Sequence, residues 1–597
     1  MYRVALYRVL LKIGVHPVQK IKSSQISGVF FSSPPKTLLT SNNHIYSLSK
    51  LENGYYPFSL DYISFSNGVP NWHKNYFNNT ESNSKNLDWW KISDFDSNLG
   101  DIKTVWELSR FDWVVQLAIT TVSGDKHSIN LLNSRLNDWI KENPYYKGVN
   151  WKCGQEASIR VLHLILAALI LDQSNNSSKP LISLIEAHIK RIAPTISYAI
   201  AQNNNHGTSE AAALFIGGHF LVSNGFIQYE NHETIGRKWL EERVNKLFSN
   251  DGCFSQYSVN YHRLALDTYS LCETYRKFNN LPPFSNLLQN KIKKAIHWLE
   301  ILTDPNSGDV PNIGSNDGAQ LFNMFNNRYR DYRNSVQWAN LVYNDRLVYS
   351  ITESQVIIFN QLGVNVKSAR KDGPIQEAIL MGNEDGFFIY KLKDILLVFR
   401  RPIFKFRPSH SDAMHVDLWL GGVNVLRDGG SYSYNISNEK IRYYNGVSSH
   451  NSIQFDDRDQ MPVLGRFLFG SWLKEVEFKY ENSNKDFTIS SAYLDHLKVY
   501  HKRELVINKN SLVVKDLYSG VYKTAELKWR LSPNKFEFIH SDNKSNEISI
   551  DIKKGVISGD YICSNEYESR YYYSESILPA ISKKLEKSGI QLTHITW

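Results

Sequence analysis

The residue types best suited to metal chemistry gather in three neighbouring motifs. His410, Asp412 and His415 lie in RPSHSDAMHVDLW, Asp428 lies in LRDGGSYSYN, and His450 lies in SSHNSIQFDD. Two imidazoles and a carboxylate from successive strand ends supply the N, O, N ligand set typical of zinc and leave one position open. A lone histidine on a strand is usually structural, but three ligand-type residues in one stretch favour a site. The motifs therefore predict that His410, Asp428 and His450 bind a divalent metal, with zinc favoured.

A second polar group stands in AQNNNHGTSEAAALFIGGHF, where a turn ends and a helix begins. Asn204, Asn205 and His206 close this turn. An amide and an imidazole at a helix N-terminus form a compact array of donors, and the helix dipole adds positive potential suited to binding a carboxylate. Asn and Ser are also common helix caps, so a plain cap is the alternative for this motif taken alone.

Two phenols fall one helical turn apart in DGCFSQYSVNYHRLALDTY. Tyr257 and Tyr261 are related by the spacing i, i+4, and His262 and Arg263 stand beside Tyr261. Either phenol can face a cavity, where we expect a neighbouring cation to lower its pKa. The alternative is that both tyrosines pack in the core, which is the commoner role on an inner helix.

Helical periodicity dominates the first half of the chain and must position these groups. Apolar residues recur at helical spacing in successive segments that Asn, Gly and Pro breakers separate. The stretch Glu156 to Leu171 is apolar nearly all round, as an inner helix packed on both sides should be. Hairpins of this kind predict an incomplete α/α toroid, with an open helical solenoid as the alternative. The predicted helices span 104–122, 126–141, 154–172, 180–202, 206–223, 231–249, 258–278 and 287–303.

Strand patterns replace helical ones after about Gly373. Segments such as FFIYKL, ILLVFR, AMHVDLWL and RELVINKNSLVVKDL alternate β-branched or aromatic residues with polar ones between Asn, Asp and Gly turns. The fold class predicted is α+β multidomain, an incomplete α/α toroid followed by an antiparallel β-sandwich. The expected domains are an irregular leader at 1–85, the toroid at 86–345, a connecting region at 346–374 and the sandwich at 375–597.

Length, net charge and composition limit the kinds of binding partner that we expect. The chain has 597 residues, too many for one hydrophobic core, and a formal net charge of +9, which favours an anionic partner. A nucleic acid is not expected, because the chain has no Lys/Arg-rich tail and no nucleic-acid motif. The four cysteines form no CxxC pair, so neither a disulfide framework nor a thiolate zinc site is predicted.

The N-terminal stretch MYRVALYRVLLKIGVHPVQK bears on location. Arg8, Lys12 and His16 interrupt its apolar runs, so a cleavable signal peptide is not expected and the sequence favours the cytoplasm. No apolar run is long enough for a transmembrane segment. Val4 to Val15 can form a short basic amphipathic helix, for which packing on the protein is favoured over contact with a membrane.

Five motifs together resemble the heparinase II/III-like polysaccharide lyases, including relatives encoded with capsule and O-antigen genes. These motifs are NNNHGTSE, QYSVNYH, RPSHSDAMHVDLW, LRDGGSYSYN and SSHNSIQFDDRDQM, and they occur in the order found in the family. WELSRFDWVVQLA and VNWKCGQEASIR extend the resemblance back to about Trp89. It implies a toroid and a sandwich that cleave a uronic-acid glycan, an acidic polysaccharide or oligosaccharide, by β-elimination. It also makes the periplasm an alternative location.

The resemblance implies particular roles for the residues that match. Asn205 and His206 match the pair that neutralises the uronate carboxylate, and Tyr261 matches the phenol that removes or returns a proton. His410, Asp428 and His450 match the structural metal ligands.

One position departs from the family. The catalytic histidine expected four residues before Asp412 is Pro408, which cannot transfer a proton. Either His206, His410 or His415 substitutes, or Tyr261 serves as both base and acid, or the activity is altered or absent.

Further residues are candidates for the substrate subsites. Their cationic, polar or aromatic side chains suit an acidic sugar, although ion pairs within the protein are the commoner role of arginines on helices. The candidates are Arg110, Arg160, Asn204, Tyr257, Arg407, His415 and Trp151, with Trp106 and Trp113 as further stacking surfaces.

Two other functions compete with this prediction. A non-catalytic glycan-binding or surface-polysaccharide assembly protein on the same scaffold is favoured by Pro408 and by the lack of a signal peptide. A hydrolase needs two carboxylates flanking the scissile bond, for which Glu210 with Asp412 or Asp317 can be considered, although no spacing singles them out. The oligomeric state stays open.

Overall fold

The structure is a computed structural model that divides into two compact units. The helical unit comprises Met1–Phe248, Arg263–Ile296 and Ala319–Gly373, and the sheet unit comprises Ser249–His262, His297–Gly318 and Pro374–Trp597. The residues described are 2–22, 24–39, 45–93, 96, 98–406, 408–465, 468–483, 486–533, 536–540, 546–550, 555–559 and 561–597.

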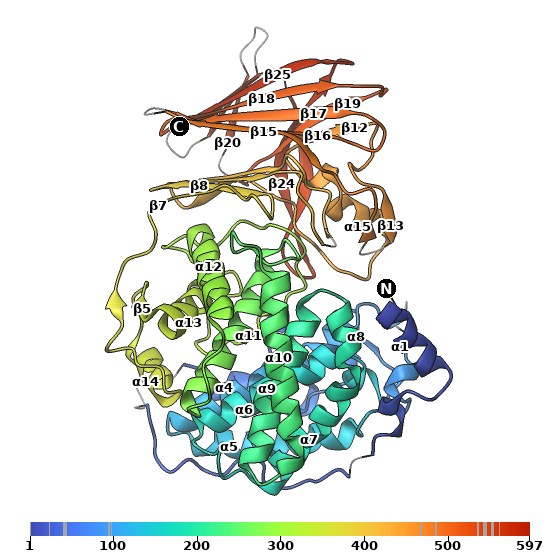
Figure 1. The fold of residues 1–597 in the computed structure, drawn as a ribbon, viewed down its shortest axis with the longest axis vertical. Coiled ribbons are helices and arrows are strands. Elements are labelled where there is room, and N and C mark those ends of the chain that lie inside the picture. Colours follow the sequence, from blue (N-terminus) through green and yellow to red (C-terminus); the bar gives the residue numbers. More distant parts are fainter. Residues whose placement is uncertain are drawn as a thin grey trace. The chain divides into compact units, whose positions relative to one another are not determined.

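Helices make up most of the helical unit (Figure 1). Helix α11 belongs to it from Arg263 onward and α12 as far as Ile296. The helices are α1 (Tyr2–Lys12), α2 (Leu48–Asn53), α3 (Lys103–Trp106), α4 (Asp112–Val122), α5 (Lys126–Glu142), α6 (Gly154–Ile170), α7 (Lys179–Ile192), α8 (Ile196–Ala201), α9 (Asn205–Ser223), α10 (Glu230–Leu247), α11 (Val259–Phe278), α12 (Asn286–Leu302), α13 (Arg333–Asn344) and α14 (Glu353–Gln361).

Helix α6 is the inner helix that the apolar pattern predicts. Every residue from Gln155 to Ile170 is buried, and the helix packs against α4, α7 and α9. Helix α9 in turn packs along α10. Since an apolar surface on all sides has to be covered on all sides, neighbouring hairpins enclose α6. The helical unit is the incomplete α/α toroid expected.

Two predicted helices are each divided in the structure. Phe111 has a left-handed φ of 71°, which separates α4 from α3 and a short 3-10 turn at Leu108–Arg110. Pro194 lies in a 3-10 turn between α7 and α8. Proline has no backbone N–H to continue the helical hydrogen bonds, which is why the predicted helix over 180–202 is two helices.

The sheet unit contains the strands of the C-terminal half, and all its strand pairings are antiparallel in the residues described. One sheet has the order β11-β10-β9-β8-β7, a second β12-β19-β24-β23, and a third β15-β16-β17-β18-β25-β22-β21-β20. Their bounds are β7 (Glu377–Leu380), β8 (Phe387–Leu392), β9 (Ile395–Arg400), β10 (Val416–Leu420), β11 (Val423–Leu426), β12 (Ile453–Phe455), β15 (Glu475–Asn482), β16 (Phe487–Leu494), β17 (Tyr500–Ile507), β18 (Ser511–Ser519), β19 (Ala525–Arg530), β20 (Phe536–His540), β21 (Asn546–Ile550), β22 (Gly555–Gly559), β23 (Ile562–Tyr571), β24 (Ser574–Leu585) and β25 (Gly589–Thr596).

Smaller elements complete both units. The sheet unit adds helix α15 (Asn438–Asn445) and the hairpin of β13 (Val463–Gly465) and β14 (Leu468–Phe469). The helical unit has three two-stranded pairs, of which β5–β6 is parallel. Their strands are β1 (Gly54–Tyr55), β2 (Ile63–Ser64), β3 (Lys74–Asn75), β4 (Thr80–Glu81), β5 (Arg346–Leu347) and β6 (Arg370–Lys371).

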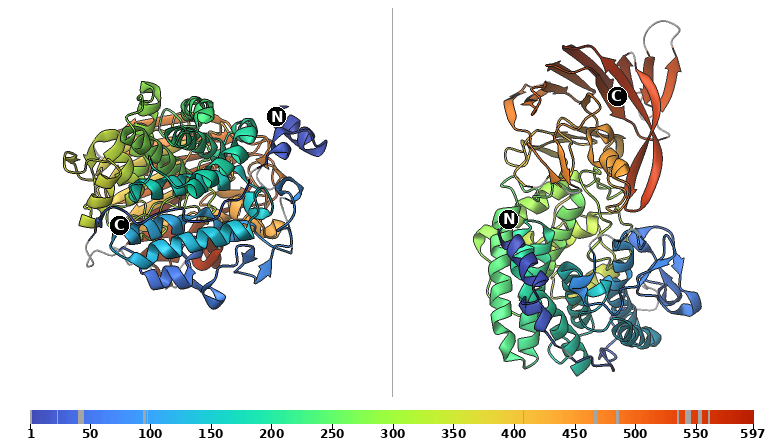
Figure 2. Two further views of the ribbon diagram at one scale, coloured as in Figure 1. Left: turned by 90° about the horizontal axis from the view of Figure 1, so that it is seen from below. Right: turned by 90° about the vertical axis from the view of Figure 1, so that its right-hand side faces the viewer.

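One apolar core joins the sheets of the sheet unit. Phe399 and Leu418 from the five-stranded sheet, Leu505 from the eight-stranded sheet and Trp529 from the four-stranded sheet share this core. Strand β17 alternates half-buried and buried residues along its whole length, as a strand with one covered face should. Figure 2 shows these strands as stacked layers, and the predicted antiparallel sandwich is confirmed.

The N-terminal helix α1 packs on the helical unit. The ring of Tyr7 stacks on Tyr198 of α8 with the ring centroids 4.1 Å apart. The side chains of Val9 and Ile13 stay largely exposed, at 54% and 62%. Within the residues described, no helix combines the length and the apolar character needed to cross a bilayer.

The segments 249–262 and 297–318 lie inside the range predicted for the toroid, yet they belong to the sheet unit. Lys391 of β8 donates a hydrogen bond to the carbonyl of Ile301 at 2.8 Å, and Ser249 donates to Asp385 at 2.7 Å. The domain bounds expected from the sequence stay a prediction.

Candidate active site and metal centre

Three predicted metal ligands meet in the interior of the sheet unit. His410 precedes β10, Asp428 follows β11, and His450 precedes β12. His410 Nδ1 lies 3.3 Å from His450 Nε2, which lies 3.2 Å from Asp428 Oδ2. One ligand atom from each residue lies within 4.8 Å of the others, and all three side chains are buried.

The remaining polar atoms of these side chains are already bonded. His450 Nδ1 donates to the carbonyl of Gly446 at 2.6 Å, and His410 Nε2 lies 3.2 Å from Ser431 Oγ. Asp428 Oδ1 accepts from the Gly430 N–H at 2.7 Å. Such outer bonds select the tautomer and orient the ligand atom. The donor set therefore fits a divalent metal held by His410 Nδ1, His450 Nε2 and Asp428 Oδ2.

The three side chains of this cluster differ in how the structure shifts their pKa values. Burial lowers the pKa of His410 to about 4. Burial alone raises the pKa of Asp428, but the neighbouring His450 outweighs it and holds that pKa below its ordinary value. Burial acts to lower the pKa of His450, but Asp428 outweighs it and raises that pKa. The cluster thus offers a neutral His410 and an ionised Asp428, and a metal would have to displace the proton that Asp428 favours on His450.

His415 and Asp412 of the same motif lie nearby but are used differently. The His415 ring is 5.4 Å from the His450 ring, and its Nδ1 accepts from the Asn451 N–H at 3.0 Å. Asp412 pairs with Arg400 at 3.3 Å. The role of His415 in substrate binding stays a prediction.

Two further positions of this region bear on the predictions made from the sequence. Pro408 is buried. The predicted substrate residue Arg407 lies outside the described residues.

Tyr261, the predicted proton-transfer residue, lies in the first turn of α11 within the sheet unit. Its hydroxyl is 2.8 Å from the hydroxyl of Tyr434, and its side chain is 7% exposed. The expectation that a nearby cation lowers its pKa is wrong. Burial raises the pKa of Tyr261 well above its ordinary value, and the carboxylate of Asp317 adds to this effect. The neighbouring Arg263 instead donates to the carbonyl of Ala319.

Tyr257 is held close to the same helix start in a left-handed conformation, with φ 53°. Its hydroxyl accepts a hydrogen bond from the Lys405 N–H at 2.6 Å, and the Arg400 guanidinium lies 4.7 Å from its ring centroid. The backbone of Gly314 runs so close that an added Cβ would come within 2.0 Å of the Tyr257 carbonyl. Its predicted role in substrate binding stays a prediction.

The Asn-His motif opens helix α9 in the helical unit. Asn204 is the N-cap, and its Oδ1 accepts from the His206 N–H at 3.2 Å. Asn205 is 2% exposed, while His206 is half-buried. His206 Nδ1 lies 3.9 Å from the Cys153 thiol at the start of α6. The capping role thus belongs to Asn204, and the catalytic roles of Asn205 and His206 stay predictions.

Glu210 stands one turn after His206 on the same helix and is 3% exposed. Burial raises the pKa of Glu210 to about 8, with His206 acting in the opposite direction. Its Oε2 has no hydrogen-bond partner within the part of the chain that the structure describes. A carboxyl group with this pKa is neutral at neutral pH. The sequence, from which Glu210 was considered only as a possible hydrolase carboxylate, did not indicate this neutral state.

Three predicted substrate residues of the helical unit are engaged in contacts within it. Arg110 makes two hydrogen bonds to Glu156, at 2.8 and 2.9 Å. Arg160 is fully buried, donates to the Asn150 carbonyl at 2.8 Å, and lies 5.3 Å from the ring of Trp151. These contacts give each side chain a structural role, and the predicted roles of Arg110, Arg160 and Trp151 in substrate binding stay predictions.

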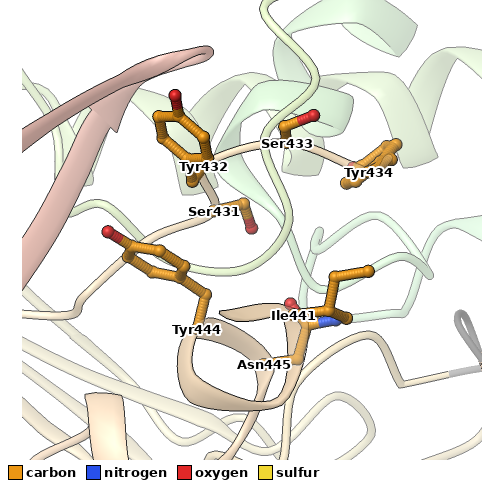
Figure 3. A pocket seen from close by; sticks show the side chains of 7 residues that line it. All are labelled: Ser431, Tyr432, Ser433, Tyr434, Ile441, Tyr444 and Asn445. Atoms are coloured by element: carbon orange, nitrogen blue, oxygen red, sulfur yellow. The ribbon is translucent and has the colours of Figure 1, made fainter. Parts of the chain in front are cut away.

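A small pocket opens beside the metal centre in the sheet unit (Figure 3). The segment 431–434 faces helix α15 across it, and Ser431 joins it to the ligand His410. Sequence reasoning missed Tyr434, although the letters SYSY follow Asp428 after two glycines and carry two phenols. The pocket is lined by Ser431, Tyr432, Ser433, Tyr434, Ile441, Tyr444 and Asn445.

Solved structures of several glycan lyases share the fold of this chain. Heparinase III has a TM-score of 0.63 at 15% identity, covering 99% of this chain and 91% of that one. A heparan sulfate lyase HepC mutant from Pedobacter heparinus has a TM-score of 0.56 at 16% identity, covering 99% and 87%. A chondroitin AC lyase from Streptomyces coelicolor in complex with chondroitin sulphate has 0.53 at 8% identity, covering 82% and 74%. At these identities the likeness concerns the fold alone.

Two family models match the amino-acid sequence of the chain. Residues 63–340 match the heparinase II/III N-terminus, and residues 378–570 match the heparinase II/III-like C-terminal domain. The chain therefore belongs to the heparinase II/III-like family. No curated protein sequence matches it.

Proposed function

We propose that this protein is a polysaccharide lyase that cleaves a uronic-acid-containing glycan by β-elimination. The observation that carries the proposal is the pairing of the Tyr261 and Tyr434 hydroxyls at 2.8 Å, in a chain of this family. Two adjoining phenols, of which one stands at the position of the family's proton-transfer residue, provide a route for the proton that β-elimination must move.

The chemistry of β-elimination needs two separate tasks. The C5 proton of the uronate leaves, its electron pair forms the C4=C5 double bond, and the C4–O4 bond breaks. Neutralising the carboxylate stabilises the negative charge that develops near C5. Asn205 and His206 at the start of α9 carry this task, since the helix N-terminus adds positive potential.

Tyr261 moves the proton. As the phenolate it accepts the C5 hydrogen, and as the phenol it returns a proton to the departing O4, so that the net transfer is from C5 to O4. This assignment needs no histidine at position 408, where the chain has Pro408. Burial, followed by Asp317, raises the pKa of Tyr261, so the resting phenol is neutral at neutral pH.

The metal centre supports this chemistry structurally. Zinc is the ion proposed, because two imidazole nitrogens and a carboxylate oxygen match its usual ligands. His410, Asp428 and His450 would hold the ion, which would then cross-link the loops that carry them. Asp428 also begins the segment that ends at Tyr434, so this residue links the proposed metal site to the segment that carries Tyr434.

An acidic polysaccharide or oligosaccharide is the proposed substrate. The formal net charge of +9 attracts polyanions and raises their local concentration. The carboxylate-binding task of Asn205 and His206 selects a sugar acid in the subsite that holds the sugar whose C4–O4 bond breaks.

The test is incubation with uronic-acid polysaccharides while the ultraviolet absorbance of the unsaturated product is recorded. Tyr261→Phe removes the proton-transfer group, and we expect a loss of about a hundredfold or more. Tyr275→Phe is the matched control on the same helix, since its hydroxyl bonds to His219 at 2.9 Å in the helical unit. Undiminished product formation by Tyr261→Phe contradicts the assignment.

A non-catalytic glycan-binding protein is the second candidate, favoured by Pro408. It predicts that the same polysaccharides bind, with a shift in a binding assay, but that no product forms under any condition. A hydrolase predicts shorter glycans that lack the ultraviolet chromophore, because hydrolysis adds water and makes no double bond.

A further inference from the structure

Two phenols from distant parts of the chain meet in the sheet unit. Tyr261 comes from the first turn of α11, and Tyr434 comes from the segment that follows the metal ligand Asp428. Their hydroxyl oxygens are 2.8 Å apart, the ordinary length of an O–H···O hydrogen bond. One hydroxyl therefore donates to the other, and the proton between them can be shared.

The surroundings of Tyr261 make a lone phenolate unfavourable. After burial, the groups that most raise the pKa of its hydroxyl in the neutral pair are Asp317, Tyr434 and Tyr572, all of which are acids. Asp317 comes from the segment after α12, where its Oδ1 accepts from Asn260 at 3.0 Å. Burial disfavours the charged form as well. A phenolate at this position consequently needs a donor to its oxygen, and once Tyr261 is ionised the Tyr434 hydroxyl, 2.8 Å away, can supply one.

Contacts with Ser569 and Tyr572 hold the segment that carries Tyr434 in place. The Tyr434 backbone N–H donates to the Tyr572 hydroxyl at 3.0 Å. The Ser431 carbonyl accepts from Ser569 Oγ at 3.0 Å. Gly430 has φ 77° and passes so close to Ser569 that a Cβ would come within 2.1 Å of its carbonyl oxygen. The donor is thus positioned before any substrate binds, which avoids an ordering cost during the reaction.

We propose that Tyr434 is a positioning residue that acts through Tyr261, donating its phenolic hydrogen to the Tyr261 oxygen so that the ionised pair shares one proton. This inference rests on the proposed function and deepens it. In the ionised pair Tyr261 accepts the C5 proton as the C4–O4 bond breaks, and O4 then takes a proton from Tyr261. The pair returns to its starting state with no other reactant.

A direct titration tests the pair without requiring activity. 3-Fluorotyrosine is placed at position 261, and its fluorine NMR shift is followed against pH in the full chain. Tyr434→Phe removes the donor, and a lost hydrogen bond to a charged group moves the midpoint upward by about one to two pH units. Tyr434→His keeps a ring N–H donor, so its midpoint should lie between those of the unsubstituted chain and of Tyr434→Phe. This variant distinguishes loss of the donor from a change in packing.

Tyr432→Phe is the matched control, because it removes a hydroxyl from the same segment while its ring stacks on Tyr573 with centroids 5.6 Å apart. Its midpoint should equal that of the unsubstituted chain. An unchanged midpoint in Tyr434→Phe overturns the pairing whether or not the protein is a lyase.

Kinetics tests the catalytic consequence. In the active protein, the rise of kcat/KM with pH should shift upward in Tyr434→Phe by the same interval, with most of the rate recovered at high pH. A uniform loss of rate with an unshifted profile indicates a merely structural role and overturns the proposal. If the unsubstituted chain makes no unsaturated product while the fluorine midpoints behave as expected, the lyase assignment fails and the hydrogen-bonded pair stands.

Discussion

At the scale of single residues, the buried His450 is the clearest test of the metal centre. His450→Ala removes one candidate ligand and leaves Asp428 without the imidazole that lies 3.2 Å from its Oδ2. We expect loss of bound metal and destabilisation of the sheet unit by roughly 3–5 kcal/mol, the cost typical of leaving a buried charge unpaired. Metal analysis and thermal unfolding measure both effects.

The control for that substitution is His594→Ala, because His594 is exposed on strand β25 of the same unit. A chelator should reproduce the change in melting temperature in the unsubstituted chain. Unaltered metal content together with unaltered melting in His450→Ala contradicts the site.

Glu210 predicts a pH dependence of stability in the helical unit. Burial raises its pKa from 4.5 to about 8, so the folded state binds more protons than the unfolded state between these values. The free energy of unfolding therefore falls as pH rises from about 4.5 to 8, by a few kcal/mol at most. Glu210→Gln should flatten this dependence in denaturant titrations at several pH values.

Glu353→Gln is the matched substitution for Glu210→Gln, since Glu353 lies exposed at the start of α14. It should leave the slope of stability against pH as it is. A Glu210→Gln variant that keeps the full slope would show that another group carries it.

At the scale of elements, the close approach of α9 and α10 depends on Gly236. A Cβ there would lie 2.2 Å from the Phe215 amide nitrogen and 2.7 Å from the Ala211 carbonyl oxygen. Ala favours a helix over Gly by about 1 kcal/mol, but backbone atoms cannot yield as a side chain can. We expect Gly236→Ala to destabilise the helical unit by roughly 2 kcal/mol or more in thermal unfolding.

Gly373→Ala provides the contrast, because an added Cβ at Gly373 meets nothing within 4 Å. Its effect should stay within about 0.5 kcal/mol, as for ordinary surface substitutions. Equal melting temperatures for the two variants would mean that the helices can move apart at little cost.

At the scale of the whole molecule, the chain passes between the two units several times. The sheet unit takes Ser249–His262 and His297–Gly318 from within the helical half of the sequence. The Val259 N–H donates to the Ile313 carbonyl at 3.2 Å, so these two segments also bond to each other. A single cut after Gly373 therefore cannot separate the units intact.

This arrangement predicts the behaviour of a fragment spanning 374–597. It lacks both segments, and Lys391 loses the Ile301 carbonyl that accepts its hydrogen bond at 2.8 Å. We expect the fragment to melt at a lower temperature than the full chain or without a cooperative transition, measured by circular dichroism and calorimetry. Adding the segments back by linkers should restore cooperativity, whereas a fragment as stable as the full chain contradicts this account.

Much of the fold could be read from local patterns. Helical periodicity located α6, and strict alternation located β17, because burial of one face or of all faces imposes its own spacing. The breaks within the predicted helices over 104–122 and 180–202 were not predicted. Pro194 is a sequence signal for the second break, whereas the left-handed Phe111 has no sequence signal comparable to glycine.

The candidate site was predicted in part. His410, Asp428 and His450 stand in recognisable motifs, and the structure brings them together. The pKa of Tyr261 was predicted with the wrong sign, because burial and Asp317 outweigh any nearby cation. Tyr434 was missed, since its partner lies far away in the sequence.

The sequence by itself determined the order of elements, the family and the metal-ligand types, because periodicity and motifs are properties of neighbouring residues. Only the tertiary structure decided that Arg160 is fully buried, that Glu210 is neutral at neutral pH, and that two phenols share a hydrogen bond. Burial, charge state and pairing depend on which distant segments pack together, and local spacing carries no record of that packing.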